Sequence, residues 1–397
     1  GDTLTFNGGL TTTSFGGTVT LNGTIASSDD AITLGNITLA SNTTINSAGG
    51  AITAAAITGS SSEDITITSS TGSTNTATVS GTIGASGNIN TVDITGSTSV
   101  SLGGNITTND ATGNTVAITG TTIDFNNITI NTDNTNNDGN ITLTHNTPQD
   151  TVTLDAGTGG IAQLTPVTTS AVIETARNNS DNISEDVFYD IDSFSVTASF
   201  ALIGGASHTG NIFLGNELAA IDFGSDLANV QARNSSSGQI FLGSDYDSAG
   251  GFLTLTSGNG VTLQDLSANN TATIDLGAGA LTITGAATLA DNAAITATGG
   301  ISFSSTIDAD NASSNDRTLN MNSGTGSTIA VTGNVGASQA LAGLTITQSN
   351  GATFSGSVDV SDSSSGTITI TDTEDGSDIT FAGSVTTDTL DLAQTGY

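Results

Sequence analysis

The sequence contains no cysteine, no tryptophan and no lysine, and its only positively charged side chains besides two histidines are Arg177, Arg233 and Arg317. Without cysteine no disulfide framework can form, so cysteine usage leaves the redox compartment open. Lyases that act on acidic polysaccharides use Lys or Arg to stabilise a developing carboxylate charge, and that machinery is missing here. Aromatic residues make up only 4% of the chain, which leaves few stacking platforms for the substrate of a glycoside hydrolase.

Negative charge, in contrast, is abundant: 37 acidic residues give a formal net charge of −34. A surface of this sign repels phosphate backbones and anionic lipid headgroups, so we expect neither nucleic-acid binding nor membrane-surface binding. No apolar run approaches the roughly 20 residues of a membrane-spanning helix, so we expect no membrane insertion. The chain begins at Gly1 without a secretory signal, and we expect a processed product or a segment of a longer protein.

Short strands separated by turn residues fill most of the chain. Ile32-Thr33-Leu34 is followed by Gly35-Asn36 and then by Ile37-Thr38-Leu39, and similar units recur from Leu4 to about Leu164. Apolar residues at alternate positions are typical of strands with one buried face. Gly and Asn tolerate the left-handed backbone angles that a sharp corner needs. The regular alternation also argues against disorder, although Gly, Ser and Asn are abundant.

The chain repeats itself at a regular period. Thr353–Val358 returns 27 residues later as Thr380–Val385, and Gly210–Gly215 returns 28 residues later as Gly238–Gly243. A strand, a small-residue turn and a further strand at this period are typical of a solenoid. A β-sandwich uses similar turns but usually needs more aromatic bulk in its core. We therefore predict an all-β fold, a parallel β-helix (β-solenoid) with turns of roughly 20–27 residues around a narrow aliphatic core.

A corner of the form Phe-x-x-x-aliphatic links the two ends of the sequence. Phe303–Ile307 matches Phe354–Val358 and Phe381–Val385, and near the start the same spacing occurs in Phe6–Leu10 and Phe15–Val19. This correspondence indicates one architecture throughout the chain.

The only two prolines, Pro148 and Pro166, lie on either side of a change in composition. We predict β-solenoid coils over residues 1–165, variant coils or an inserted subdomain over 166–252, and β-solenoid coils again over 253–397. Two short segments, 171–177 and 226–233, are candidates for a turn or two of helix. The central section is richer in aromatic residues: Phe188, Tyr189, Phe194, Phe200, Phe213, Phe223, Phe241, Tyr246 and Phe252.

The stretch Asn315–Gly326, followed by Ile329–Gly336, resembles the repeats of long bacterial surface proteins that are rich in Gly, Ser, Thr and Asn. These are β-solenoid proteins of the filamentous-haemagglutinin and autotransporter-passenger type. The resemblance extends over nearly the whole chain through composition and period. It implies a right-handed parallel β-helix, secretion, and an adhesive or structural role.

The candidate chemical groups do not form a catalytic constellation. Asp29-Asp30 and the pair Asp245 and Asp247 are adjacent carboxylates, which we interpret as turn residues at corners. His145 and His208 are isolated in the sequence from each other and from any nucleophile motif, so no triad or zinc site is indicated. We assign no catalytic, cofactor-binding or metal-binding residue and predict that the protein is not an enzyme.

Calcium is the cofactor that the acidic turns favour most. Asp372–Asp378 places four carboxylates in a turn that contains Gly376, and Asp133–Asn140 is rich in side-chain oxygens around Gly139. Neither segment has the EF-hand spacing with its closing Glu, and the Gly-rich nonapeptide repeat of calcium-binding rolls is absent. Both segments are therefore interpreted first as solvated acidic loops, with calcium binding as the alternative.

A β-helix exposes unpaired backbone groups at its two ends, and monomeric solenoids have to cap them. Strand patterning runs from Leu4 to Leu392, and no amphipathic helix that could serve as a cap is indicated at either end. We expect an extracellular, non-enzymatic structural protein that associates with itself head to tail into a filament or surface layer. The alternative is an adhesin stalk segment of a large secreted surface protein that binds glycan or host protein. Besides further copies of the chain, glycans or other surface proteins are the partners that we expect.

Overall fold

The computed structural model of the protein describes residues 3–14, 16–70, 75–86, 88–175, 187–188, 194–215, 221–222, 229–243, 245–248, 250–265, 270–310, 317–362, 365–374 and 376–392. These residues form an all-β structure, a parallel β-solenoid of about 14 turns, which confirms the predicted fold class. The candidate helices are wrong within the described residues, since β20 (Ile173–Glu174) and β26 (Val230–Arg233) are strands. In the same part of the chain, no helix is long and apolar enough to cross a membrane.

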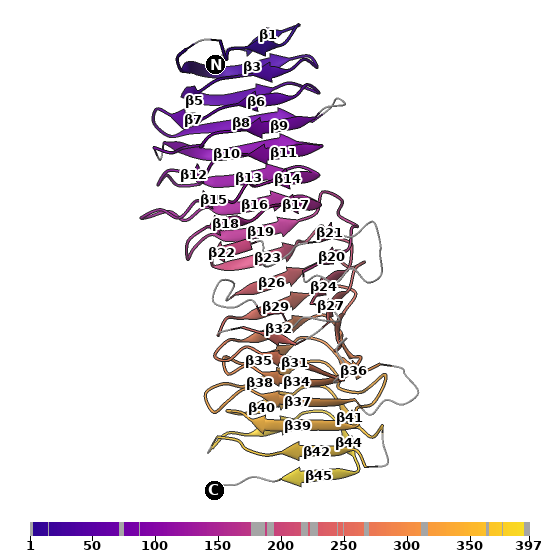
Figure 1. Ribbon diagram of the computed structural model, residues 1–397. Coiled ribbons are helices and arrows are strands. Elements are labelled where there is room, and N and C mark those ends of the chain that lie inside the picture. Colours follow the sequence, from indigo (N-terminus) through magenta and orange to yellow (C-terminus); the bar gives the residue numbers. More distant parts are fainter. Residues whose placement is uncertain are drawn as a thin grey trace. The chain divides into compact units, whose positions relative to one another are not determined.

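The chain forms two compact units, each a stack of parallel strands (Figure 1). The first unit consists of Gly1–Thr168 and Tyr189–Leu202, and the second consists of Thr169–Phe188 and Ile203–Tyr397. The passage from one to the other falls within β23 (Phe200–Gly204). This boundary lies inside the section predicted to carry variant coils; the three sections proposed from the sequence stay a prediction.

Three ladders of parallel strands build the first unit. The longest consists of β1 (Thr3–Phe6), β3 (Val19–Ser27), β5 (Ile37–Asn46), β8 (Glu63–Ser69), β10 (Ile89–Gly96), β13 (Thr115–Thr119), β16 (Asn140–Thr144) and β19 (Ile161–Thr165). The second consists of β2 (Leu10–Thr11), β4 (Ile32–Thr33), β6 (Ile52–Ala54), β9 (Thr76–Val79), β11 (Ser99–Leu102), β14 (Thr122–Asp124) and β17 (Thr147–Gln149). The third consists of β12 (Ile106–Thr107), β15 (Ile128–Asn131), β18 (Val152–Asp155) and β22 (Phe194–Thr197), while β7 (Ile57–Gly59) pairs with β5.

Three ladders of parallel strands also run through the second unit. One consists of β26, β29 (Leu253–Thr256), β32 (Leu281–Thr284), β35 (Ile301–Phe303), β38 (Ile329–Val331), β40 (Ala352–Phe354) and β43 (Ile379–Phe381). Another consists of β21 (Val187–Phe188), β20, β24 (Ile212–Leu214), β27 (Ile240–Leu242), β30 (Val261–Leu263), β33 (Ala287–Leu289) and β36 (Ile307–Ala309), followed by β41 (Val358–Val360) and β44 (Val385–Thr387). The last consists of β25 (Ile221–Asp222), β28 (Tyr246–Asp247), β31 (Thr271–Asp275), β34 (Asn292–Thr296), β37 (Thr318–Asn322), β39 (Gly343–Gln348), β42 (Thr367–Ile370) and β45 (Thr389–Leu392).

The sequence repeats correspond to strand register. Phe354 of β40 pairs with Phe381 of β43, and Val358 pairs with Val385, so the two copies lie directly on one another. The rings of Phe354 and Phe381 are stacked with centroids 5.1 Å apart. The other repeat behaves in the same way, because Ile212–Leu214 pair residue for residue with Ile240–Leu242. Both predicted repeats are confirmed as neighbouring turns.

The Phe-x-x-x-aliphatic corner is also a structural position. Phe303 pairs with Val331, which pairs in turn with Phe354, so the corner residues form one column in the second unit. In the first unit Phe6 ends β1 and Leu10 starts β2, so this corner joins a strand of the longest ladder to a strand of the second ladder. The corner predicted at Phe15 lies outside the described residues.

Residues paired between neighbouring turns lie mostly 18 to 28 positions apart, close to the predicted period; Leu21 with Leu39 and Ile301 with Ile329 are the two extremes. The aromatic-rich section departs from this period. Val152 pairs with Phe194 in the first unit, and Ile173 pairs with Ile212 in the second. Both intervals contain β21, which pairs with β20 through Val187 and Ile173.

The core is a set of aliphatic columns. In the first unit Ile45, Ile67, Ile94 and Ile118 succeed one another in register, and none of them is exposed. Their neighbours along each strand are Thr, Asn, Asp or Ala that point outward, as the alternation predicts. Burying an aliphatic side chain of this size contributes about 1.5–3 kcal/mol, so each turn adds several such contributions to the stability of the stack.

Asparagine side chains satisfy backbone groups at the corners. Oδ1 of Asn105 accepts a hydrogen bond from the backbone N–H of Thr129, 3.0 Å away in the next turn, and Oδ1 of Asn334 accepts from the N–H of Ser357 at 2.9 Å. Asp245 plays the same part toward Thr273, as expected for a corner residue. A backbone donor close to the start of a strand is therefore satisfied by a side chain of the preceding turn.

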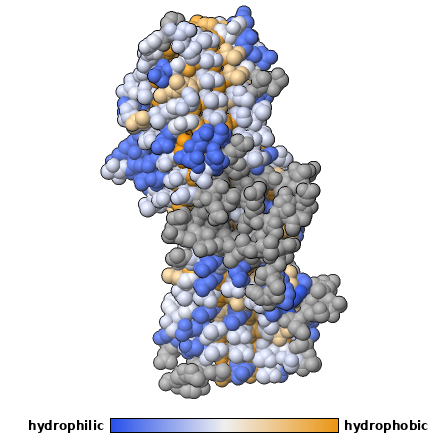
Figure 2. Space-filling view, viewed as in Figure 1, coloured by the Kyte–Doolittle hydropathy of each residue, from blue (hydrophilic) through white to orange (hydrophobic). Residues whose placement is uncertain are grey.

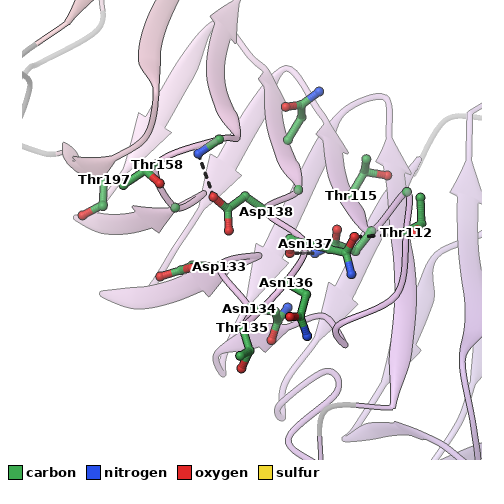
Figure 3. A pocket seen from close by; sticks show the side chains of 16 residues that line it. Thr112, Thr115, Asp133, Asn134, Thr135, Asn136, Asn137, Asp138, Thr158 and Thr197 are labelled. Atoms are coloured by element: carbon green, nitrogen blue, oxygen red, sulfur yellow. Dashed lines mark hydrogen bonds between the residues drawn. The ribbon is translucent and has the colours of Figure 1, made fainter.

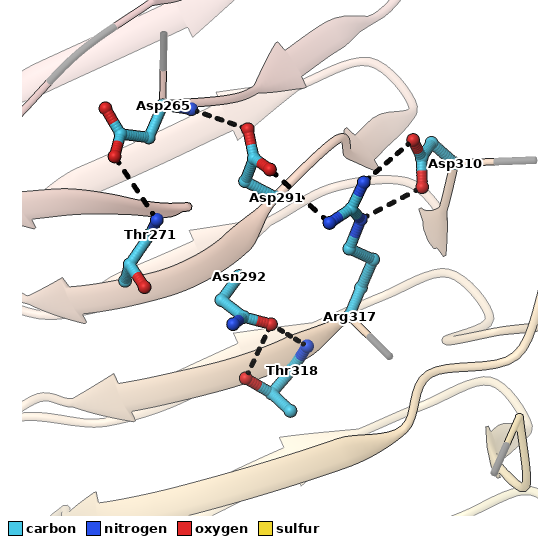
Figure 4. A network of polar contacts seen from close by, with 7 residues as sticks. All are labelled: Asp265, Thr271, Asp291, Asn292, Asp310, Arg317 and Thr318. Atoms are coloured by element: carbon cyan, nitrogen blue, oxygen red, sulfur yellow. Dashed lines mark hydrogen bonds and ion pairs between the residues drawn. The ribbon is translucent and has the colours of Figure 1, made fainter. Parts of the chain in front are cut away.

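The described surface in view consists mostly of residues of intermediate hydropathy (Figure 2). Figure 2 shows pale, neutral colouring over most of the described surface in view, with separate areas of strongly hydrophilic residues. Among the described residues, the ion pairs are those of Arg317 in the second unit. Its guanidinium donates two hydrogen bonds to Asp310, at 3.0 and 3.2 Å, and one at 3.4 Å to Asp291 (Figure 4).

Candidate functional site

An open, polar pocket of about 710 Å³ lies in the first unit (Figure 3). Three segments from successive turns surround it: the approach to β13, the connection from β15 to β16, and the connection from β18 to β19. One residue of β22 completes it. Its lining residues are Thr112, Gly113, Asn114, Thr115, Asp133, Asn134, Thr135, Asn136, Asn137, Asp138, Gly139, Asn140, Gly157, Thr158, Gly159 and Thr197.

Buried hydrogen bonds hold the 133–139 segment in place. Asn114 is buried, and its Nδ2 donates to Oγ1 of Thr108 at 3.1 Å and to the carbonyl of Thr132 at 2.9 Å. The hydroxyl of Thr132 in turn donates to the carbonyl of Gly139 at 2.6 Å. These bonds close the base of the segment and give the buried side chains of Asn114 and Thr132 hydrogen-bond partners.

The amide side chains of the segment are directed to the preceding turn. The backbone N–H and Nδ2 of Asn136 donate to the carboxylate of Asp110, at 3.0 and 2.7 Å, and Nδ2 of Asn137 donates to the carbonyl of Asp110 at 2.9 Å. Nδ2 of Asn134 donates to the carbonyl of Asn109 at 2.8 Å. The hydrogen bonds from Asn136 and Asn137 hold the pKa of Asp110 below its ordinary value.

Two carboxylates, Asp133 and Asp138, contribute negative charge to the pocket (Figure 3). Oδ2 of Asp138 accepts a hydrogen bond from the backbone N–H of Gly159 at 2.7 Å. Burial raises the pKa of Asp133, and the negative charges of Asp155 and Asp138 raise it further. A ligand that carries positive charge would therefore be favoured here over an anion.

Glycine is required where Asp138 meets the next turn. Gly157 has a positive φ of 65°, and a Cβ atom at this position would lie 2.6 Å from Cγ of Asp138. Any side chain at residue 157 would thus push the carboxylate aside as well as straining the backbone.

The other candidate groups of the sequence lie apart from this pocket. Both histidines are buried, and His145 packs edge-on against Phe125 with ring centroids 6.2 Å apart. Burial lowers the pKa of His145 to about 3 and also lowers the pKa of His208. Asp30 accepts a hydrogen bond from the hydroxyl of Ser27 through its carbonyl, and Asp29 has a positive φ, so this pair occupies a corner.

The two segments considered for calcium differ in their surroundings. Asp133–Asn140 forms one wall of the pocket. In the other segment Asp372 accepts a hydrogen bond from Nε2 of Gln348 at 3.0 Å, and Asp375 lies outside the described residues. Within the described ranges, no three or more acidic or histidine side chains come close enough together to hold a metal ion. Calcium binding stays a prediction.

The end turns form a second kind of surface. In β45, Leu390 and Leu392 are 54% and 64% exposed, although they lie in register with Ile368 and Ile370, which are almost completely buried. Val385 is likewise 42% exposed above buried Val358. At the other end of the described chain Leu4 is 58% exposed. These turns present core positions to solvent.

Sequence reasoning identified Asp133 and Asp138 but missed Asp110, Asn114 and Gly157. Asp110 and Asn114 are separated from the acidic segment 133–140 by about one turn of sequence, and only the strand register brings them close to it. The turn period of 20–27 residues was the signal that could have found them.

Comparison with family models, curated proteins and solved structures finds no match to this chain. The class of protein therefore follows from the fold: the chain is a parallel β-solenoid repeat protein.

Proposed function

We propose that this chain is a non-enzymatic structural protein of the cell surface that associates with further copies of itself, end turn to end turn, into a filament or layer. The observation that carries the proposal is the exposure of Leu390, Leu392 and Val385 directly above buried residues of the same columns. Such columns can be covered by another stretch of solenoid, and in this proposal a second copy supplies it.

The physical gain from end-to-end association has two parts. Backbone N–H and C=O groups at the free edge of β45 can pair with a strand of another copy, as in any open sheet edge. Covering a Leu or Val side chain that is otherwise exposed contributes about 1.5–3 kcal/mol when burial is complete. Parallel strands of like spacing allow both contributions at once.

The candidate acid–base groups support a non-enzymatic role. His145 and His208 are buried in the cores of the two units and do not line the pocket, so neither is placed to transfer a proton to a ligand there. Arg317 is engaged with Asp310 and Asp291. The extracellular location in the proposal rests on the resemblance of the repeats to those of bacterial surface proteins.

Electron microscopy and sedimentation velocity of the purified chain test the proposal. We expect fibres or long oligomers for the unchanged protein and their loss in Leu392→Lys, because a charge would then face the apolar column of the neighbouring copy. Val167→Lys is the matched control, since Val167 is also exposed, at 41%, but lies away from the end turns. Single particles of unchanged protein at all concentrations would refute self-association.

A second candidate function is an adhesin segment that binds carbohydrate. The polar pocket of the first unit favours it, because its Asp, Asn and Thr side chains supply hydrogen-bonding groups that match the hydroxyl groups of a sugar. This function and end-to-end association occupy different surfaces of the chain and can be tested separately.

A further inference from the structure

The donor groups of the pocket are largely consumed by the protein itself. The side-chain amide nitrogens of Asn134, Asn136 and Asn137 all donate to the turn before them, and that of Asn114 donates to Thr108 and Thr132. A ligand that needs hydrogen-bond donors from the protein, such as a uronic acid or a phosphate, would find few here.

Acceptors remain. Of the two oxygens of Asp138, Oδ2 accepts from Gly159, which leaves Oδ1 and the carboxylate of Asp133 as acceptors at the pocket (Figure 3). Both groups carry negative charge, and Asp155 adds to the field at Asp133. Hydrogen bonds between an ammonium group and a carboxylate are about twice as strong as neutral ones, so the ligand that matches this wall carries an amine.

The remaining lining adds hydroxyl groups. Thr112, Thr115 and Thr158 lie around the pocket, and a hydroxyl can both donate to and accept from a sugar hydroxyl (Figure 3). The volume of about 710 Å³ falls within the range of roughly 300–1,000 Å³ for small-molecule sites and accommodates one or two monosaccharide units. Calcium fits less well, because it takes six to eight oxygen ligands and the described residues bring together no group of three acidic side chains for it.

We propose that the pocket formed by Thr112–Thr115, Asp133–Asn140 and Gly157–Gly159 binds a positively charged amino sugar, with its ammonium group at Asp133 and Asp138. The proposal deepens the adhesin function: it rests on that candidate and names its ligand class. It is independent of end-to-end association, which uses the exposed end turns. An anionic or fully acetylated sugar binds more weakly at the same position, because it offers no ammonium group to the two carboxylates.

Isothermal titration calorimetry with the full chain tests this. The probe is a glucosamine trimer; its N-acetylated form has the same skeleton without the charge, and spermidine has the charge without the sugar. We expect heat of binding with the glucosamine trimer and affinity at least tenfold weaker with the other two. Asp133→Asn and Asp138→Asn are each expected to weaken binding at least tenfold, whereas Asp150→Asn, an exposed acidic residue outside the pocket, changes it less than twofold.

Three results would overturn the proposal. Equal binding of the acetylated trimer would remove the role of the ammonium group, and equal binding of spermidine would reduce the effect to attraction by net charge. An equal loss of affinity in Asp150→Asn would also reduce the effect to attraction by net charge. Electron microscopy of Asp133→Asn separates the two functions. Fibres of normal appearance in this variant show that a loss of sugar binding arises at the pocket and not from a loss of self-association.

Discussion

His145 is an ionisable side chain enclosed in an apolar environment, and this makes the first unit sensitive to acid. Burial lowers its pKa to about 3, whereas an unfolded histidine titrates near 6.5. Because the neutral form is the one that folds, stability is fully present above pH 6.5 and is lost as the pH falls toward 3. At pH 4.5 the loss attributable to His145 is about 2–3 kcal/mol.

Urea unfolding of the unchanged protein and of His145→Leu, each at pH 7 and pH 4.5, measures this contribution. We expect the difference between the two pH values to be about 2–3 kcal/mol smaller in the variant. Asp110, whose pKa is lowered by hydrogen bonds from Asn136, also contributes less to the stability of the fold on acidification, but this change is the same in both proteins. The same pH dependence in both proteins would show that His145 is not the responsible group.

Residue identity alone predicted part of the pocket. Asp133 and Asp138 stand out in the sequence because acidic and amide residues gather around Gly139. Their partners do not stand out, since Asp110 and Asn114 are ordinary turn residues whose importance comes from lying one turn before. The direction of the Asn amides also could not be predicted, because it depends on which carbonyl groups of that turn are free to accept.

Several turns of the second unit are tied together by Arg317. The guanidinium contacts Asp310 and Asp291, and the carboxylate of Asp291 accepts from the backbone N–H of Asp265 at 2.9 Å (Figure 4). The carboxylate of Asp265 accepts from the N–H of Thr271. The chain of contacts thus runs from the end of β30 to the start of β37. Removing the single cation leaves partly buried carboxylates close to each other without a counterion.

We predict that Arg317→Met lowers the free energy of unfolding by about 1.5–3 kcal/mol, as expected for hydrogen bonds that involve charged groups. Urea unfolding followed by circular dichroism measures it. Asp310→Asn and the double variant complete a thermodynamic cycle, in which the second change should cost less when Arg317 is already absent. Strictly additive costs would mean that the two side chains are not coupled.

At the level of strands and turns the sequence was a good guide where it repeated. The stretches around Phe354 and Phe381 are in register because the same residue types recur at the same spacing. Each side chain therefore lies on its counterpart in the next turn, and the two Phe rings are stacked. It failed at Ile173–Glu174 and Val230–Arg233, where a short helical pattern was overridden by pairing with the neighbouring turns. Local preference over so few residues is weaker than the hydrogen bonds of an existing ladder.

The whole molecule carries a formal net charge of −34, and this charge opposes folding. Within the described residues, the ion pairs offsetting it are those of Arg317. Repulsion among surface carboxylates falls as salt shortens the screening length, from about 30 Å at 0.01 M to about 10 Å at 0.1 M. We therefore predict that the midpoint of urea unfolding rises between about 0.01 and 0.1 M sodium chloride and then levels off.

The identity of the cation decides between screening and specific binding. If screening alone acts, choline chloride and sodium chloride raise the midpoint equally at equal ionic strength, because the Debye length depends on ionic strength and not on ion type. A calcium ion held by Asp133–Asn140 or Asp372–Asp378 would add stability that saturates near stoichiometric concentration, since a ligand bound only to the folded state stabilises it by mass action. We expect equal effects of sodium chloride and choline chloride, because screening of the net charge depends on ionic strength alone. Saturation at low calcium would contradict that expectation and assign the acidic turns to metal binding.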